Sequence, residues 1–294
     1  MNSTHGSKDS SSPPGTDLRM AIAPYGGPHS NRLLAALSDA EWQRLRTQLQ
    51  AVELSQGQVL IDAGRVPSHV YFPTTASVSL LSTTRAGDSA ELAEVGNEGM
   101  VGIPVVMGGG STLSEAVVKT SGLAVRLSRF AIKEEFDRGG AVMQVLLRYT
   151  QALMTHLAQT AACNRHHSVD QRLCRCLLDS ADRAPEQDLA MTQESLALCL
   201  GVRRESVTVS AQKLQRDGVI ERTRGRITVL SRSALEARSC ECYALVRREY
   251  DRLLPDDMAA QPTLAAPARR AAVDRPRLPP VAAVQAALRS RVAA

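Results

Sequence analysis

The sequence predicts an α+β protein with a β-rich N-terminal domain, one long helix, and a small C-terminal domain built from short helices and a β-hairpin. Three observations support this prediction. Short runs rich in Val and Leu alternate with Gly, Pro, Asn and Asp between residues 51 and 127, as is typical of antiparallel sheets. No Gly or Pro interrupts residues 141–166. Gly201 separates two short helical segments, and two β runs follow them.

The composition is that of an ordinary globular protein. Hydrophobic residues make up 44% and charged residues 22% of the 294 residues, a length that suits about two domains of roughly 150 residues each. No apolar run reaches the roughly 18 residues of a membrane helix, and residues 1–15 lack a secretory signal. We therefore expect a cytoplasmic protein without a membrane segment, in which the six cysteines are free thiols.

Changes in composition divide the chain into five parts. Residues 1–30 are rich in Ser, Gly and Pro, and residues 255–294 in Pro, Ala and Arg, so both ends are expected to be disordered. Residues 31–138 are expected to form the N-terminal domain, residues 139–166 the long helix, and residues 167–254 the C-terminal domain with a closing helix from residue 233.

The N-terminal domain is expected to begin with helices and to continue as a sheet. Ser38 and Glu41 match a capping box, which predicts a helix start at Ser38. The short runs that follow predict an antiparallel barrel or sandwich. Residues 128–137 are expected to form a short helix. Glu91, Glu94 and Glu98 alternate near a strand end and are expected to face solvent.

The long helix carries apolar residues at steps of three and four. They are Val142, Val145, Leu146, Tyr149, Leu153, Leu157 and Ala161. Such a stripe covers a core, faces a partner helix, or does both, and pairing between subunits would make the protein a dimer. His156 is expected at an interface or on the surface rather than as a metal ligand.

The C-terminal domain matches the pattern of a winged helix-turn-helix. Thr192 is expected to cap a helix over residues 193–200, Gly201 permits a sharp turn, and a second helix follows over residues 203–216. Residues 219–220 and 227–230 are expected to form the hairpin, or wing. In this motif the second helix enters the DNA major groove, which is about 12 Å wide.

Charge supports DNA binding by this domain. Residues 192–232 contain eight basic and four acidic residues, and three of the arginines (Arg222, Arg224 and Arg226) lie on the wing, where they can bind phosphates. A solvated basic face on a helical domain is the alternative. The combination of charge, turn, helix lengths and wing favours DNA.

The order of these parts resembles the cyclic-AMP receptor protein and fumarate-nitrate reduction regulator (Crp-Fnr) family of bacterial transcription factors. The matching stretches are Leu54-x-x-Gly57-x-Val59-Leu60, Val70-Tyr71-Phe72, Glu98-Gly99-x-x-Gly102 and Thr192-Gln193-Glu194-x-Leu196-Ala197-x-x-Leu200-Gly201-Val202-x-Arg204-Glu205-Ser206-Val207-Thr208. The resemblance spans residues 31–242 and implies a β-roll sensor domain and a homodimer on palindromic double-stranded DNA. Its half-sites would lie about one helical turn apart. It also implies RNA polymerase as a partner.

The resemblance assigns roles to individual residues. Arg204 and Glu205 match the family's base-contacting pair, which can bind guanine and cytosine. Val209 stands where many members have a further arginine, so the half-site is expected to differ. The expected base-contacting residues are Arg204, Glu205, Thr208 and Val209, and the expected phosphate-binding residues are Thr192, Gln193, Arg203, Ser206, Arg222, Arg224 and Arg226.

The expected effector pocket differs from that of members that bind cyclic AMP. Those members carry a Gly-Glu pair for the ribose and an arginine for the phosphate, whereas this chain has Gly99-Met100 and Thr112-Leu113-Ser114. A buried cyclic phosphate without a positive partner would be costly, so cyclic AMP is not the expected ligand. The pocket residues are Gly99, Met100, Val101, Gly102, Thr112 and Ser114. An unidentified effector and a constitutive regulator without one both stay open.

No cofactor, metal or enzyme activity is expected. Relatives that sense oxygen hold an iron–sulfur cluster through N-terminal cysteines, and this chain has no cysteine before Cys163. Residues 163–167 could form a metal or redox site, but buried cysteine usually behaves as a small hydrophobe. Cys240 and Cys242 would point apart on a helix. The sequence contains no P-loop, G-x-S-x-G or H-E-x-x-H motif. A β-roll that acts through a protein partner is the alternative function.

Overall fold

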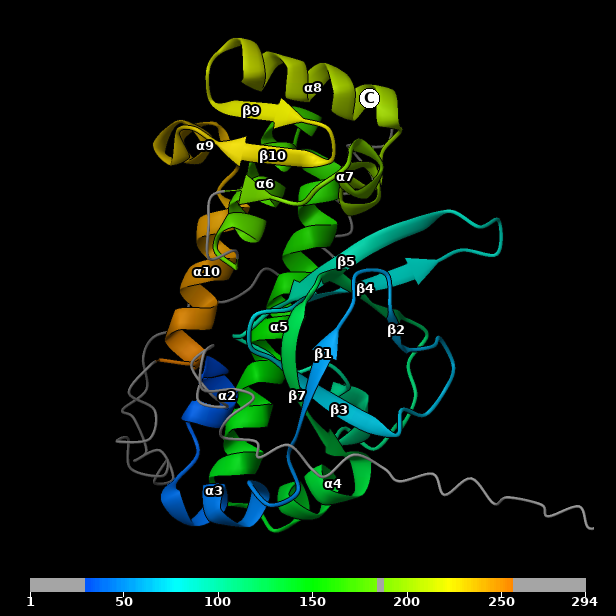
Figure 1. Cartoon of the computed structure of the whole chain (residues 1–294), viewed down its shortest axis with the longest axis vertical. Coiled ribbons are helices and arrows are strands. Elements are labelled where there is room, and N and C mark those ends of the chain that lie inside the picture. Colours follow the sequence, from blue (N-terminus) through cyan, green and yellow to red (C-terminus); the bar gives the residue numbers. More distant parts are fainter. Residues whose placement is uncertain (1–29, 184–187, 256–294) are drawn as a thin grey trace, which may run out of the picture. The chain divides into compact units, whose positions relative to one another are not determined.

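The computed structural model describes residues 30–183 and 188–255 (Figure 1). The predicted N-terminal arm and C-terminal tail lie outside the described residues, apart from Ser30 and Pro255. The described part begins with α2 (Arg32–Ala35) and α3 (Asp39–Leu45). The predicted capping box is present, because Ser38 accepts from the Glu41 backbone and the Glu41 side chain accepts from the Ser38 backbone.

Two antiparallel sheets form the β-roll. Within the described residues, one sheet has the order β1-β7-β3 and the other the order β2-β6-β4-β5. The bounds are β1 (Gln50–Leu54), β2 (Val59–Ile61), β3 (His69–Pro73), β4 (Ser77–Thr83), β5 (Ser89–Val95), β6 (Glu115–Thr120) and β7 (Gly122–Ser128). Leu54 and Ala124 of the first sheet share a buried cluster with Val118 of the second, so the inner faces of the two sheets pack together.

Helices cover the other face of the β1-β7-β3 sheet. The sequence correctly predicts α4 (Arg129–Asp137), which Ser128 caps, and α5 (Gly140–His166). Gly139 and Gly140 separate them with φ angles of 79° and 78°, a conformation that favours glycine. The main core joins Phe72 and Val125 of the sheet to Leu146 and Tyr149 of α5. The short 3-10 helix η3 (Ile103–Val105) lies between β5 and β6.

The C-terminal domain has a core of its own. Its elements are α6 (Val169–Ala181), β8 (Asp188–Leu189), α7 (Gln193–Leu200), α8 (Arg204–Arg216), β9 (Ile220–Thr223), β10 (Arg226–Val229), α9 (Arg232–Arg238) and α10 (Cys242–Leu253). Leu177 of α6, Leu196 of α7, Val207 of α8 and Ile227 of β10 share one buried cluster. Ser168 forms a capping box with Gln171 at the start of α6.

The prediction of one closing helix from residue 233 is wrong. The chain forms two helices, and α9 ends where Ser239 adopts an extended conformation and donates its backbone N–H to Leu235 O at 2.9 Å. The break lets Leu235 of α9 enter the C-terminal core while Tyr250 of α10 enters the core around α5. Figure 1 shows α10 alongside α5. Helical periodicity continues through the break, so the sequence does not reveal it.

Candidate nucleic-acid interface and sensor domain

The two helices of the helix-turn-helix are held by caps and a shared core. Thr192 Oγ1 accepts from the Ser195 backbone N–H at 3.0 Å and so caps α7. Gly201 ends α7 with φ of 57°, where a side chain would be strained. Val207, Ala211 and Leu214 of α8 are buried and form its inward stripe. Only the opposite side of α8 is left to contact a partner.

The outward side of α8 carries the residues expected to contact bases. Arg204 and Glu205 are exposed, and the side chain of Val209 is 54% exposed. Arg204 Nε donates to Gln193 Oε1 at 3.3 Å, and Thr208 Oγ1 donates to the same oxygen at 3.0 Å. Gln193, at the start of α7, therefore orients two side chains of α8. Figure 1 shows α8 and the β9–β10 hairpin at the same end of the C-terminal domain.

The hairpin brings three arginines to the same surface. Strands β9 and β10 pair antiparallel with Arg226 opposite Thr223, and Arg224 and Gly225 form the turn. An open hollow of about 470 Å³ lies between the start of α7, α8 and the hairpin. Its lining includes Thr192, Gln193, Arg204, Arg222, Arg224 and Arg226. The structure thus brings together six residues that the sequence predicts to contact DNA.

Four arginines of this surface keep their positive charge unpaired within the described part of the chain. Lys213 pairs with Asp170 at 2.9 Å, and Arg238 pairs with Asp217 at 2.8 Å, both away from the hollow. In residues 30–183 and 188–255, Arg203, Arg204, Arg222 and Arg224 form no ion pair. These side chains can therefore offer their full charge to a polyanion.

The expected effector pocket is partly filled by α5. Gly99 lies under the ring of Tyr149, so a Cβ on Gly99 would be only 2.7 Å from that ring. Tyr149 Oη donates to Met100 O at 3.0 Å, and Met100 and Val101 are both 1% exposed. The pKa of Tyr149 is raised by burial, which keeps its hydroxyl protonated as the donor. Gly99–Val101 is therefore a contact between the β-roll and α5.

The remaining pocket residues do not complete a cyclic-nucleotide site. Gly102 packs on Val70, and Thr112 and Ser114 lie half-buried before β6, where Thr112 O accepts from the Gly64 N–H at 2.7 Å. No arginine occurs in residues 96–120. A cyclic phosphate would thus find no guanidinium within this segment.

The prediction that Glu91, Glu94 and Glu98 face solvent is wrong. Glu91 and Glu94 are 9% and 5% exposed, and Lys119 Nζ lies 3.2 Å from Glu91 Oε1 and 2.7 Å from Glu94 Oε2. Although burial opposes it, the charges of Lys119 and Arg183 lower the pKa of Glu94 to about 2. Helices α5 and α7 pack against β5, so its carboxylates lie in the interior.

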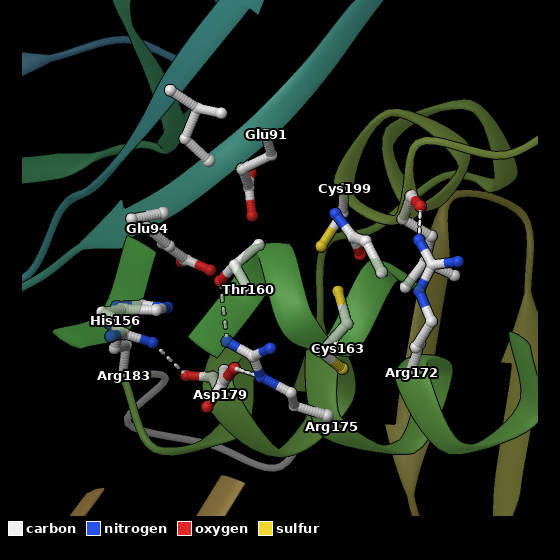
Figure 2. Close-up of a pocket in the computed structure, with 15 residues that line it drawn as sticks. Glu91, Glu94, His156, Thr160, Cys163, Arg172, Arg175, Asp179, Arg183 and Cys199 are labelled. Atoms are coloured by element: carbon white, nitrogen blue, oxygen red, sulfur yellow. Dashed lines mark hydrogen bonds and ion pairs between the residues drawn. The ribbon is translucent and has the colours of Figure 1, made fainter. Parts of the chain in front are cut away.

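These carboxylates link the β-roll to α6 and the residues that follow it. Ser180 Oγ donates to Glu94 Oε2 at 3.2 Å, and Arg183 donates to Glu98 Oε1 at 2.7 Å through Nη2 and at 3.0 Å through Nε. Figure 2 shows Glu91 and Glu94 of β5 facing His156 and Thr160 of α5. The sequence missed this network because its two halves are far apart along the chain.

His156 is buried, contrary to the expectation of a surface or interface position. Its side chain is 4% exposed, lies against Tyr250 with ring centroids 6.1 Å apart, and lines a cavity of about 40 Å³. Burial lowers the pKa of His156 to about 3, with further lowering by Arg175 and Arg183. Burial also raises the pKa of nearby Asp179 to about 6. Among the described residues, no partner accepts from or donates to His156 Nδ1.

Four residues with metal-binding side chains meet where α5 ends. Cys163 lies near the end of α5 and His167 directly follows it, whereas Cys240 lies between α9 and α10 and Cys242 is the first residue of α10. Their four ligand atoms lie within 4.8 Å of one another. The expectation that Cys240 and Cys242 diverge on a helix is wrong, because Cys240 precedes α10. The C-x-C and C-x-x-x-H spacings are signals that could have indicated the cluster.

Within residues 30–183 and 188–255, no helix has both the length and the apolar character needed to span a membrane.

Comparisons with known proteins agree with this geometry. The model of the cyclic nucleotide-binding domain family matches residues 51–138, and that of the Crp-like helix-turn-helix domain matches residues 171–238. A comparison with curated protein sequences finds no match.

Solved structures share the fold at low sequence identity. A transcriptional regulator of the Crp/Fnr family from Eubacterium rectale is 16% identical, with a TM-score of 0.58 over 70% of this chain and 96% of that chain. FixK2 from Bradyrhizobium japonicum is 16% identical, with a TM-score of 0.58 over 65% of this chain and 98% of that chain. The regulator CLP from Xanthomonas campestris, described as responsive to c-di-GMP, is 15% identical, with a TM-score of 0.55 over 65% and 99%. With a cyclic nucleotide-binding domain followed by a Crp-like helix-turn-helix domain, the chain belongs to the Crp-Fnr family of DNA-binding transcription regulators.

Proposed function

We propose that the protein is a homodimer that binds a palindromic DNA site through Arg204 and Glu205 of each subunit. The outward side of α8 is the observation that carries this proposal, because it is exposed, bears arginines without ion pairs in the described residues, and lies beside the wing. Thr208 and Val209 are the further base contacts. Thr192, Gln193, Arg203, Ser206 and the wing arginines Arg222, Arg224 and Arg226 are the phosphate contacts.

An exposed stripe on α5 supports the dimer. Leu147 is 52% and Met154 is 62% exposed, and Ala158 and Ala161 continue the stripe at steps of four and three. This spacing places the residues along one side of α5, where a second copy of the helix can pack in parallel. Burying both stripes in a dimer would remove apolar surface that the single chain leaves in water.

The proposed signal reaches the DNA-binding domain through the contacts of the β-roll with α5 and α6. Gly99–Val101 contacts Tyr149 of α5, and the carboxylates of β5 contact α6. We propose that Gly99–Gly102 transmits a change in the β-roll to α5 and that a small effector, where one acts, binds nearer Thr112 and Ser114. The effector need not be a cyclic nucleotide.

Binding of selected DNA by the full chain tests the proposal. Duplexes enriched from a random pool are titrated by fluorescence anisotropy at several salt concentrations, with wild type, Arg204→Ala and Arg248→Ala. Arg248 is an exposed arginine of α10 outside the helix-turn-helix. We expect binding to weaken with salt, and Arg204→Ala to lose roughly 1–3 kcal/mol together with its preference at one base pair.

Two results would count against this function. Equal loss on every sequence would make Arg204 a phosphate contact. No binding to any duplex at low salt would favour the alternative, in which the β-roll binds a ligand and the chain acts on a protein partner.

A further inference from the structure

The cluster at the end of α5 has the donors and the spacing of a single-ion site. Cys163 lies in the last turn of α5, and His167 directly follows that helix in an extended conformation, with its backbone N–H donating to Cys163 O at 3.0 Å. Cys163 Sγ lies 3.5 Å from Cys240 Sγ, and Cys242 Sγ lies 3.4 Å from His167 Nδ1. Tetrahedral zinc, with Zn–S bonds of about 2.3 Å, places neighbouring sulfur atoms about 3.8 Å apart.

The distances do not suit other uses of these cysteines. A disulfide requires sulfur atoms about 2.05 Å apart, and all six cysteines are free in the structure. The sulfur atoms are also too close together to surround a cluster of several iron atoms, because the four donors lie within 4.8 Å of one another. The arrangement therefore matches one ion with four protein ligands.

The surroundings of the four donors also suit a metal. Cys163, Cys240 and Cys242 are 1%, 3% and 0% exposed, so bulk water does not compete for their sulfur atoms. His167 Nε2 lies 3.3 Å from Glu241 Oε1, which leaves Nδ1 as the nitrogen that faces the sulfurs. A carboxylate on the far nitrogen of a ligating histidine is the usual way to orient the ring.

Two further side chains can stabilise the thiolates, one by a hydrogen bond and one by its charge. Gln159 Nε2 donates to Cys242 Sγ at 3.1 Å. Figure 2 shows the guanidinium of Arg175 close to Cys163. Three thiolates around a divalent cation leave a net charge of about −1, which a neighbouring guanidinium compensates.

We propose that Cys163, His167, Cys240 and Cys242 bind one zinc ion. The site is closed, with four protein ligands, and is therefore structural rather than catalytic. It joins the end of α5 to the start of α10. The site lies directly before Ser168, which caps α6. The ion would stabilise the region where the chain passes from the long helix α5 into the DNA-binding domain. This inference does not depend on which DNA the protein binds.

Metal analysis of the full chain tests the site. The protein is purified under reducing conditions, saturated with zinc, dialysed, and measured by elemental analysis. We expect one zinc per chain for wild type and for Cys174→Ser, and loss of bound zinc for Cys240→Ser and His167→Gln. Cys174 is the matched control, since it is a buried cysteine of α6 outside the cluster. Cobalt in place of zinc should give the visible absorption bands of a tetrahedral thiolate site in wild type and in Cys174→Ser, which keep all four ligands. Cys240→Ser and His167→Gln should not show these bands.

A variant that keeps all four ligands separates weaker zinc binding from loss of folding. Glu241 is 67% exposed, so Glu241→Gln should leave the fold intact and weaken zinc binding roughly 10- to 100-fold in a competition with a chelating dye. Zinc should raise the melting temperature of wild type and of Cys174→Ser but not that of His167→Gln. A folded wild-type chain that takes up no zinc would overturn the proposal, as would a Cys163–Cys240 disulfide or bound iron with inorganic sulfide in its place.

Discussion

His156 illustrates how a single buried residue can set a pH dependence. Burial, with Arg175 and Arg183 nearby, holds its pKa at about 3, compared with 6.5 for an exposed histidine, while Glu94 acts in the opposite direction. The unfolded chain therefore binds a proton on this residue before the folded chain does. The free energy of unfolding should fall as the pH drops below about 6.5 and continue to fall towards pH 3, by at most about 1.4 kcal/mol per pH unit.

The measurement is chemical denaturation of wild type and His156→Gln between pH 7.5 and 5. Asp179, whose pKa burial raises to about 6, contributes with the opposite sign, because its stabilisation is lost as the pH rises through that value. Since Asp179 is present in both proteins, their difference isolates His156. We expect a shallower profile for the variant, and parallel profiles would show that His156 is charged or solvated in the folded state.

Gly99 gives a second prediction at the scale of one residue. A Cβ at Gly99 would approach the Tyr149 ring to 2.7 Å, whereas a Cβ at Gly109 would have only Ser111 O, at 3.9 Å, as a near neighbour. Gly99→Ala should therefore lower the free energy of unfolding by about 1–3 kcal/mol through overpacking, and Gly109→Ala should change it little. Urea midpoints of the two variants and wild type measure the difference, and equal midpoints for Gly99→Ala and wild type would contradict the tight contact.

At the scale of elements, local signals were the reliable ones. Ser38 and Thr192 are predicted as helix caps because the capping partners lie within three positions of one another. The outward side of α8 follows from its buried stripe. The break after α9 and the burial of β5 depend on packing between segments far apart in the chain, so neither could be predicted from periodicity.

The two helices of the helix-turn-helix also depend on each other through Gln193. Its Oε1 accepts from both Arg204 and Thr208, so Gln193→Ala should leave these side chains less well oriented for DNA. One hydrogen bond contributes about 1 kcal/mol, and we expect roughly five-fold weaker binding to the selected duplex. Gln48→Ala, at an exposed glutamine before β1, is the control. Unchanged affinity for Gln193→Ala would mean that DNA reorients both side chains by itself.

At the scale of the whole molecule, the β-roll and the DNA-binding domain share buried charges. Glu91, Glu94 and Glu98 of the β-roll meet Lys119 within it and Arg183 after α6. These five residues could not be grouped from the sequence, because the pattern of β5 by itself is that of a strand with one polar face. The packing of α5 and α7 against β5 makes its carboxylates interior groups. The same argument applies to Cys163 and Cys240, which the α9–α10 break brings together.

A double-mutant cycle on Arg183 and Glu98 tests whether these charges couple the two domains. The side chains are 14% and 12% exposed and 2.7 Å apart, so Arg183→Met leaves Glu98 without its cation, while Glu94 keeps Lys119, and should cost about 3 kcal/mol. Glu98→Gln should cost less, because Arg183 still faces Glu94. In the double variant, position 98 no longer carries an uncompensated charge. The double variant should therefore lose less free energy of unfolding than the sum of the two single losses, by at least about 1 kcal/mol. Urea unfolding of the four proteins gives the coupling directly, and strictly additive losses would show that solvent, rather than Arg183, compensates Glu98.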